Sequence, residues 1–234
     1  MSGHSKWNKI HRQKGVADAK RGVLFTRFGN AITAAAKTGG GDPETNFHLR
    51  LVIEKARAAN MTKDNIDKAI KRGTGELTGG NLEAVRYEGF GPDGVALIID
   101  CLTDNRNRTS SELKHILAKH GGSLGGPNSV AWLFEQKGVI QLQKISEDLE
   151  LELIDAGVEE ITKDAEGTTI YTKFSDLKKI KDRLESQGLT LEAAEIDWLA
   201  KEKKIIRQQE LLEQLFEALD EFPDINDYYS NAQD

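Results

Sequence analysis

The stretch VRYEGFGPDGVALIIDCL, residues 85–102, carries the clearest structural signal in the sequence. Residues 85–90 and 95–102 read as two strands, and Gly91-Pro-Asp-Gly94 between them has the composition of a tight turn. The stretch therefore predicts a β-hairpin. Residues 89–94 also match the dinucleotide-binding pattern G-x-G-x-x-G. That pattern needs a helix after its glycines, and here a strand follows, so we interpret it as a turn.

The chain after the hairpin predicts alternating helices and strands. Leu113, Ile116 and Leu117 mark a helix, and residues 130–134 form an apolar run that predicts a strand. A regular series then follows: strand 138–144, helix 148–156, strands near 158–162 and 168–173, helix 176–186 and strand 191–199. This βαββαβ order is typical of a ferredoxin-like lobe.

Two last elements predict a discontinuous domain. A long helix and a short strand over 225–229 end the sequence; the helix is marked by Ile205, Leu212, Leu215, Phe216 and Leu219. We expect them to complete the lobe that the hairpin begins. The predicted class is α+β, with a helical domain over 1–80, a discontinuous domain over 81–136 and 202–234, and an inserted domain over 137–201.

The region before the hairpin predicts helices. Leu24, Phe28, Ala31 and Ala35 form one apolar stripe, and the glycines at 39–41 end that helix. Residues 42–44, Asp-Pro-Glu, predict the start of a second helix with Phe47, Leu51 and Ala58 on one face. Thr62 is the expected N-cap of a third helix, which contains Ile66, Ala69 and Ile70 and ends at Gly73.

Charge is distributed unevenly along the chain. The net charge of −6 combines +8 over residues 1–80 with −14 over residues 81–234, and the first 37 residues contain eight basic side chains and one acidic one. This asymmetry predicts a basic arm that binds a polyanion. The arm is attached to acidic lobes, which are the candidate surface for a protein partner. The alternative interpretation of the arm is a solvated helix surface.

Nothing in the sequence predicts catalysis or a bound cofactor. The histidines lack metal-ligand spacing, Cys101 is the only cysteine, and no Walker motif is present. The longest apolar run, residues 95–99, is far shorter than the roughly 20 residues of a membrane span. Basic side chains interrupt the N-terminal region where a signal peptide would be apolar. We therefore expect a cytoplasmic protein with no enzyme activity, no metal, no cofactor, no small-molecule substrate and no membrane contact.

The loop TDNRNRT, residues 103–109, is a second candidate site. It follows a predicted strand and leads into a helix, with Arg106 and Arg108 placed to bind phosphates as guanidinium forks. In the alternative interpretation the polar residues only shape the loop, and Thr109 or Ser110 caps the helix.

Several motifs together resemble the YebC/PmpR family of probable transcriptional regulators. They are GHSKW at 3–7, AKRG at 19–22, NM at 60–61, DNI at 64–66, YEGFGP at 87–92, TDNR at 103–106, GGSL at 121–124, VAWLF at 130–134 and DINDYYSN at 224–231. The resemblance runs from residue 2 to the end. It implies a three-domain YebC-like architecture, with a helical N-terminal domain and two α+β, ferredoxin-like lobes, the third domain inserted in the second. It also implies DNA binding and gene regulation without catalysis. Because the family includes a mitochondrial translational activator, it implies a second possibility, which is action at the ribosome.

The sequence therefore predicts a nucleic-acid-binding regulator whose partner is DNA or, alternatively, ribosomal RNA. The expected phosphate contacts are Lys6, Lys9, Arg12, Lys14, Lys20, Arg21 and Arg27. Trp7 is expected either to stack on an unpaired base or to anchor the arm to the core.

Overall fold

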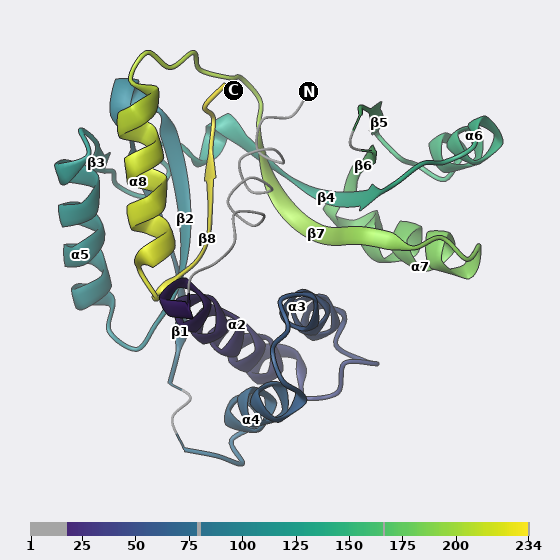
Figure 1. Ribbon diagram of the computed structural model, residues 1–234, viewed down its shortest axis with the longest axis horizontal. Coiled ribbons are helices and arrows are strands. Elements are labelled where there is room, and N and C mark those ends of the chain that lie inside the picture. Colours follow the sequence, from purple (N-terminus) through teal and green to yellow (C-terminus); the bar gives the residue numbers. More distant parts are fainter. Residues whose placement is uncertain (1–17, 79–80, 166, 234) are drawn as a thin grey trace. The chain divides into compact units, whose positions relative to one another are not determined.

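The computed structural model describes residues 18–78, 81–165 and 167–233, except for the side chains of residues 18–20. Residues Glu135–Leu199 form one compact unit, and the described residues on either side of this segment form the other. In the larger unit, three helices precede a four-stranded sheet (Figure 1).

The helical region consists of α2 (Asp18–Gly39), α3 (Phe47–Ala58) and α4 (Lys63–Gly73). The predicted stripe on α2 is confirmed at Ala31 and Ala35, which are buried. The hydrophobic core of the helical region also contains residues outside this stripe; they are Ile32, Ala36, Leu49, Ile53, Ala56, Met61, Ile66 and Ala69. The prediction that Thr62 caps α4 is confirmed, because its side chain accepts a hydrogen bond from the backbone N–H of Asn65.

The predicted start of α3 is wrong. The N-cap is Asn46, whose Oδ1 accepts from the backbone N–H of Leu49 at 3.1 Å, while its Nδ2 donates to the carbonyls of Ala35 and Gly40. These bonds fix the end of α2 and the start of α3 with one buried side chain, so Asp42 forms only the preceding turn. The buried face of α3 therefore differs in part from the predicted one. Its buried residues are Leu49, Leu51, Ile53 and Ala56, whereas Ala58 is exposed.

The sheet of the larger unit has the strand order β3-β1-β2-β8. Strands β1 (Glu83–Phe90) and β2 (Ala96–Thr103) form the predicted antiparallel hairpin, joined by a short 3-10 turn over Pro92–Gly94. Strand β3 is Ser123–Leu124, and the last strand, β8 (Ile225–Ser230), pairs antiparallel with β2. The chain therefore returns to this sheet after residue 200.

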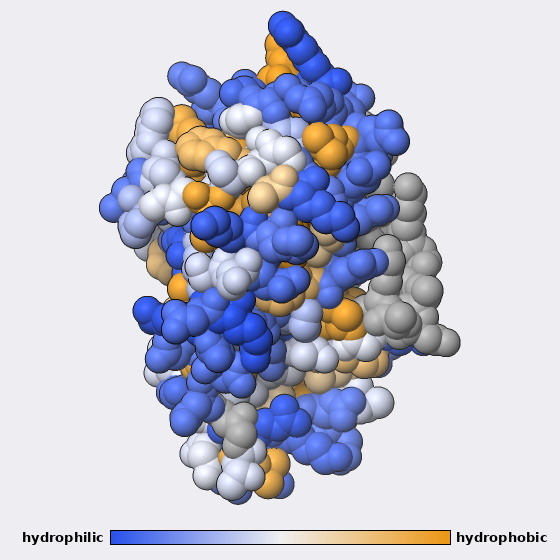
Figure 2. Space-filling model, turned by 90° about the vertical axis from the view of Figure 1, so that its left-hand side faces the viewer, coloured by the Kyte–Doolittle hydropathy of each residue, from blue (hydrophilic) through white to orange (hydrophobic). Residues whose placement is uncertain are grey.

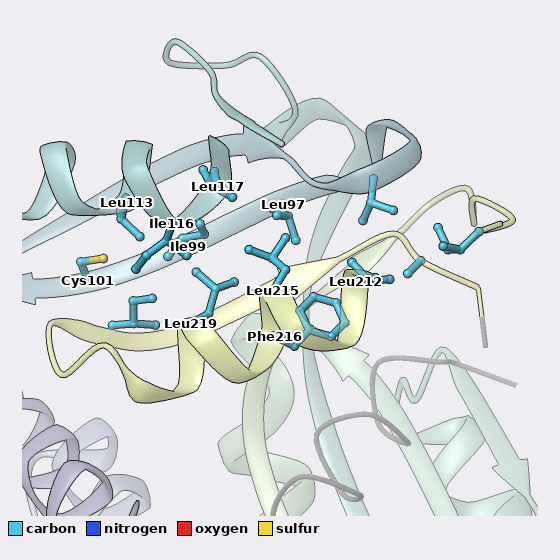
Figure 3. Packing of buried hydrophobic residues seen from close by; sticks show 14 residues of the cluster. Leu97, Ile99, Cys101, Leu113, Ile116, Leu117, Leu212, Leu215, Phe216 and Leu219 are labelled. Carbon is cyan, nitrogen blue, oxygen red and sulfur yellow. The ribbon is translucent and has the colours of Figure 1, made fainter. Parts of the chain in front are cut away.

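Helices α5 (Arg106–Lys119) and α8 (Gln209–Glu221) pack against β2 and enclose the main core (Figure 3). Alternate residues of β2, Leu97, Ile99 and Cys101, belong to this cluster together with side chains from both helices. Burial of Cys101 raises the pKa of its thiol to about 12, which fits the predicted role as a small apolar residue.

The smaller unit has the sheet order β5-β6-β4-β7. Its elements are β4 (Phe134–Leu142), α6 (Glu147–Asp155), β5 (Glu160–Lys163), β6 (Thr168–Lys173), a 3-10 turn over Phe174–Asp176, α7 (Leu177–Ser186) and β7 (Leu191–Ala200). This βαββαβ series with two central antiparallel neighbours, β4 and β6, is the predicted ferredoxin-like lobe.

Two predicted elements are wrong in detail. Residues 131–133 form a 3-10 turn rather than a strand, because the backbone N–H groups of Val130 and Ala131 donate to the side chain of Glu88 and are unavailable for a strand ladder. Helix α8 begins at Gln209, so Ile205 lies outside it and is 75% exposed. Here Asp93, at φ 54°, accepts the backbone N–H groups of Arg207 and Gln208 just before the helix.

Candidate nucleic-acid interface

Half of the predicted contacts lie outside the described residues. These are Lys6, Trp7, Lys9, Arg12 and Lys14. Lys20 lies in the first turn of α2, and its side chain is also outside the described part. Arg21, one residue further on, is exposed on α2.

Arg27 has a different role from the one predicted. Its side chain is only 12% exposed, and its Nη2 donates to the carbonyl oxygens of Leu219, at 2.6 Å, and Phe222, at 3.1 Å. Its Nη1 lies 3.6 Å from Oδ1 of Asp220. The last carbonyls of a helix lack intrahelical donors and carry partial negative charge, which a guanidinium neutralises. Arg27 therefore binds the C-terminal end of α8, and we no longer count it among the candidate phosphate contacts.

The 103–109 loop is a helix start built from side chain to backbone bonds. Asn105 is the N-cap of α5, with its Oδ1 accepting from the backbone N–H of Arg108 at 3.1 Å, so the expectation that Thr109 or Ser110 caps this helix is wrong. The hydroxyl of Thr109 is buried and donates to Oδ2 of Asp224 at 2.7 Å. The loop thereby joins the end of β2, the start of α5 and the residue before β8.

The two arginines of this loop already have anionic neighbours. Nε of Arg106 is 2.6 Å from Oε2 of Glu83, and Nη2 of Arg108 is 2.9 Å from Asp224 and 3.0 Å from Asp104. Their side chains remain 63% and 54% exposed. A phosphate at this loop would have to compete with these carboxylates, so the geometry favours the interpretation in which the loop residues shape the loop.

Three exposed cations at the ends of α2 and α4 were not singled out from the sequence. They are Lys37, Lys71 and Arg72, which we call the helix-end cations. The two helix ends are in contact: Oγ1 of Thr33 donates to the carbonyl of Ala69 at 3.0 Å, and a side chain at Gly73 would meet the backbone of α2. Packing of two helices that are distant in the sequence thus collects positive charge at one end of the helical region.

One buried acidic group, Glu88, organises the backbone around it. Glu88 is 7% exposed, and its carboxylate accepts from the backbone N–H groups of Asn128, Val130 and Ala131 at 2.7–2.8 Å. Burial alone would raise its pKa, but these donors more than compensate, and the pKa of Glu88 is lowered. In the described ranges, no group of three or more His, Cys, Asp or Glu side chains is arranged to hold a metal ion.

The face of the molecule drawn in Figure 2 is mainly hydrophilic, and its apolar residues lie in small separate groups. Leu151 and Ile154 of the acidic helix α6 are exposed, at 64% and 53%. No helix among the described residues is long and apolar enough to cross a membrane.

Comparisons with known proteins cover nearly the whole chain. Residues 5–76 match the family model described as TACO1/YebC protein N-terminal domain, and residues 82–232 match the model described as TACO1/YebC second and third domain. A relative from Persephonella marina, named probable transcriptional regulatory protein, is 48% identical over 100% of this chain and 96% of its own length. A relative of the same name from Nitrosococcus oceani is 48% identical over 99% of this chain and 96% of its own.

A solved structure agrees with the fold. The crystal structure of the conserved hypothetical protein Aq1575 from Aquifex aeolicus is 40% identical in sequence and has a TM-score of 0.82. The similarity covers 94% of this chain and 93% of that one.

Proposed function

Because this chain belongs to the TACO1/YebC family, whose relatives above are named probable transcriptional regulatory proteins, we propose that it is a non-catalytic, cytoplasmic regulator that binds DNA through its basic N-terminal region. The observation that carries the proposal is the charge asymmetry of +8 over residues 1–80 against −14 over the rest. Positive charge concentrated in one region is the electrostatic requirement for binding a polyanion.

The proposed phosphate contacts are the cations of the arm and the start of α2, namely Lys6, Lys9, Arg12, Lys14, Lys20 and Arg21. The helix-end cations extend the positive surface, although cations in the last turn of a helix also complement its dipole. Contacts of this kind hold a protein on the backbone of a nucleic acid without reading its sequence.

A second candidate function is that of a translation factor that contacts ribosomal RNA. The described helices carry no motif of a known groove-reading element such as a zinc finger or basic zipper. Structured RNA is recognised largely by shape and by contacts to phosphate and 2′-hydroxyl groups, for which a basic arm is sufficient.

The salt dependence of binding tests the proposal. If four to six cations meet phosphates, the slope of log K against log salt on duplex DNA is roughly −4 to −5. The variant K6Q/K9Q/R12Q/K14Q should bind unrelated sequences with similarly reduced affinity, and its slope should be flatter by about three to four units. A matched control changes four lysines of the acidic smaller unit to Gln: Lys144, Lys173, Lys178 and Lys179.

The same variant separates the two candidate functions. A promoter-binding regulator retains some sequence preference in competition assays and associates with chromosomal DNA. A ribosome-bound factor shows no preference on DNA, sediments with ribosomes, and loses this association when the arm is changed. Equal binding of both polyanions by the variant and the parent protein would contradict the role of the arm.

A further inference from the structure

Trp132 is exposed in a way that is uncommon for its residue type. Its side chain lies in the 3-10 turn over Ala131–Leu133 and is 66% exposed, whereas most of the apolar residues around it in the sequence are buried or half-buried. Its Nε1 donates to the carbonyl of Ser129 at 3.2 Å. This bond fixes one edge of the indole to its own loop and leaves a large aromatic surface open to solvent.

The loop that carries Trp132 is held rigidly from several sides. Glu88 accepts three backbone N–H groups of this loop, including those of the two residues before Trp132. The backbone N–H of Leu133 donates to the carbonyl of Val130 at 2.9 Å. Lys201 adds two bonds, one from its backbone N–H to the carbonyl of Leu133 and one from its Nζ to the carbonyl of Trp132, both at 2.9 Å. The ring is therefore positioned before any ligand arrives, which reduces the entropy lost on binding.

The neighbourhood of Trp132 contains one buried carboxylate and one exposed ammonium group. Residues 113–134 contain no Asp or Glu, but the carboxylate of Glu88 lies next to this loop, where it is 7% exposed and accepts from the backbone N–H groups of Val130 and Ala131. Lys201 is exposed, and the carbonyl of Trp132 occupies only one of the three donors of its ammonium group. An open aromatic face with a lysine beside its backbone is a combination with which proteins hold single-stranded nucleic acid.

We propose that Trp132 is a stacking platform for an unpaired nucleobase, with Lys201 beside it to meet the adjoining phosphate. This inference rests on the proposed function and extends it from the phosphate backbone to the bases. It names a second point of contact, outside the N-terminal region and within the loop that Glu88 orders. Stacking accepts any base, since every base has an aromatic face, so the site adds affinity for unpaired strands without sequence preference.

The test compares four probes of equal length: single-stranded RNA, single-stranded DNA, duplex DNA and an abasic strand that has phosphates but no bases. W132A should lose about five- to 150-fold in affinity for the two base-containing single strands, and W132F should retain most of it. Binding to the duplex and the abasic strand should not change. The matched control is F174A, which removes another exposed aromatic side chain, 52% exposed, from the smaller unit.

Fluorescence gives a second readout that affinity alone cannot provide. In the double variant W7F/W198F, Trp132 is the only remaining tryptophan, since the chain has three. Base-containing single strands should quench its emission by stacking, and the abasic strand should not.

Each outcome has a distinct meaning. Unchanged binding of single strands by W132A, with the wild type still binding duplex DNA, overturns the stacking site and leaves the proposed function standing; Trp132 would then serve a protein contact. An equal loss on the abasic strand also overturns it, because bases would not be involved. A wild-type protein that binds none of the four probes overturns the proposed function together with the inference.

Discussion

Two charges, the half-buried Arg27 and the buried Glu88, act on backbone groups at distant points of the larger unit. Arg27 of α2 neutralises the carbonyls that end α8, almost 200 residues later in the sequence. The carboxylate of Glu88 in β1 accepts hydrogen bonds from three backbone N–H groups of the loop at residues 128–131. Glu88 satisfies three backbone N–H groups that have no partner in a helix or sheet, whereas Arg27 adds a charged donor to carbonyls that already accept the N–H groups of Phe222 and Ile225. Removal of either charge is therefore costly.

Replacement of Arg27 by Met should destabilise the larger unit. The change removes charge-assisted bonds from a side chain that is 12% exposed, and the expected loss in free energy of unfolding is about 2–3 kcal/mol. Urea unfolding followed by circular dichroism measures it. The exposed Arg57→Met in α3 is the control and should change stability by less than about 0.5 kcal/mol. If the two variants were equally stable, Arg27 would have no structural role.

Glu88 predicts a dependence of stability on pH. Its pKa is lowered in the folded state, so its contribution is fully present above the ordinary Glu pKa of about 4.3 and is lost as pH falls through the lowered folded value. Glu88→Gln keeps the shape but loses the charge, and should cost about 2–3 kcal/mol at pH 7. The difference between wild type and variant should shrink below about pH 4. A difference that stays constant down to pH 2 would show that ionisation of Glu88 does not matter.

At the scale of elements, the contact between α2 and α4 depends on a residue without a side chain. A Cβ at Gly73 would lie 2.5 Å from the carbonyl oxygen of Thr33 and 2.7 Å from Cβ of Ala36. Both distances are too short for a carbon atom, so α4 approaches α2 this closely only because position 73 is glycine.

Gly73→Ala should therefore separate the two helix ends and cost about 1–3 kcal/mol. Gly22 provides the matched control, because it lies within α2 and a Cβ there meets no atom within 4 Å. Gly22→Ala should leave stability unchanged or raise it by up to about 1 kcal/mol, since alanine favours the helix. Thermal unfolding of the two variants gives the comparison, and a destabilised G22A with an unaffected G73A would refute the packing argument.

Local patterns predicted most elements because hairpins, helices and strands depend on neighbouring residues. The turn at 91–94 and the βαββαβ series are examples. Patterns failed for two different reasons. At α3 two neighbouring residues compete as the cap, and Asn46 rather than Asp42 accepts the N–H of Leu49; at 130–134 the distant side chain of Glu88 prevents the expected strand. The same limit applies to the candidate site. The charge count identified the basic region, but only the fold shows that Arg27 faces α8 and that Trp132, expected within a strand, is exposed.

At the scale of the whole molecule, the sheet of the larger unit requires both ends of its sequence. Helix α8 and strand β8 provide Leu212, Leu215, Phe216, Leu219 and Ile225 to the main core. A fragment of residues 81–136 lacks this part of the core and should show weak amide-exchange protection. A fusion of 81–136 to 202–234 through a short linker restores it and should unfold cooperatively. If the short fragment alone gives a cooperative thermal transition, α8 and β8 are dispensable for this lobe.

The pairing of Leu97 in β2 with Ser230 in β8 joins two strands that the ribosome synthesises far apart in time. A ribosome that adds about 5–20 residues per second delivers β8 roughly 6 to 25 seconds after β2. The smaller unit, Glu135–Leu199, is complete before β8 emerges, so it can fold before the sheet of the larger unit is complete. Before β8 emerges, the edge of β2 that pairs with it is unpaired and the apolar residues of β2 lack part of their core. In this interval the nascent chain is most prone to aggregation and most dependent on a chaperone.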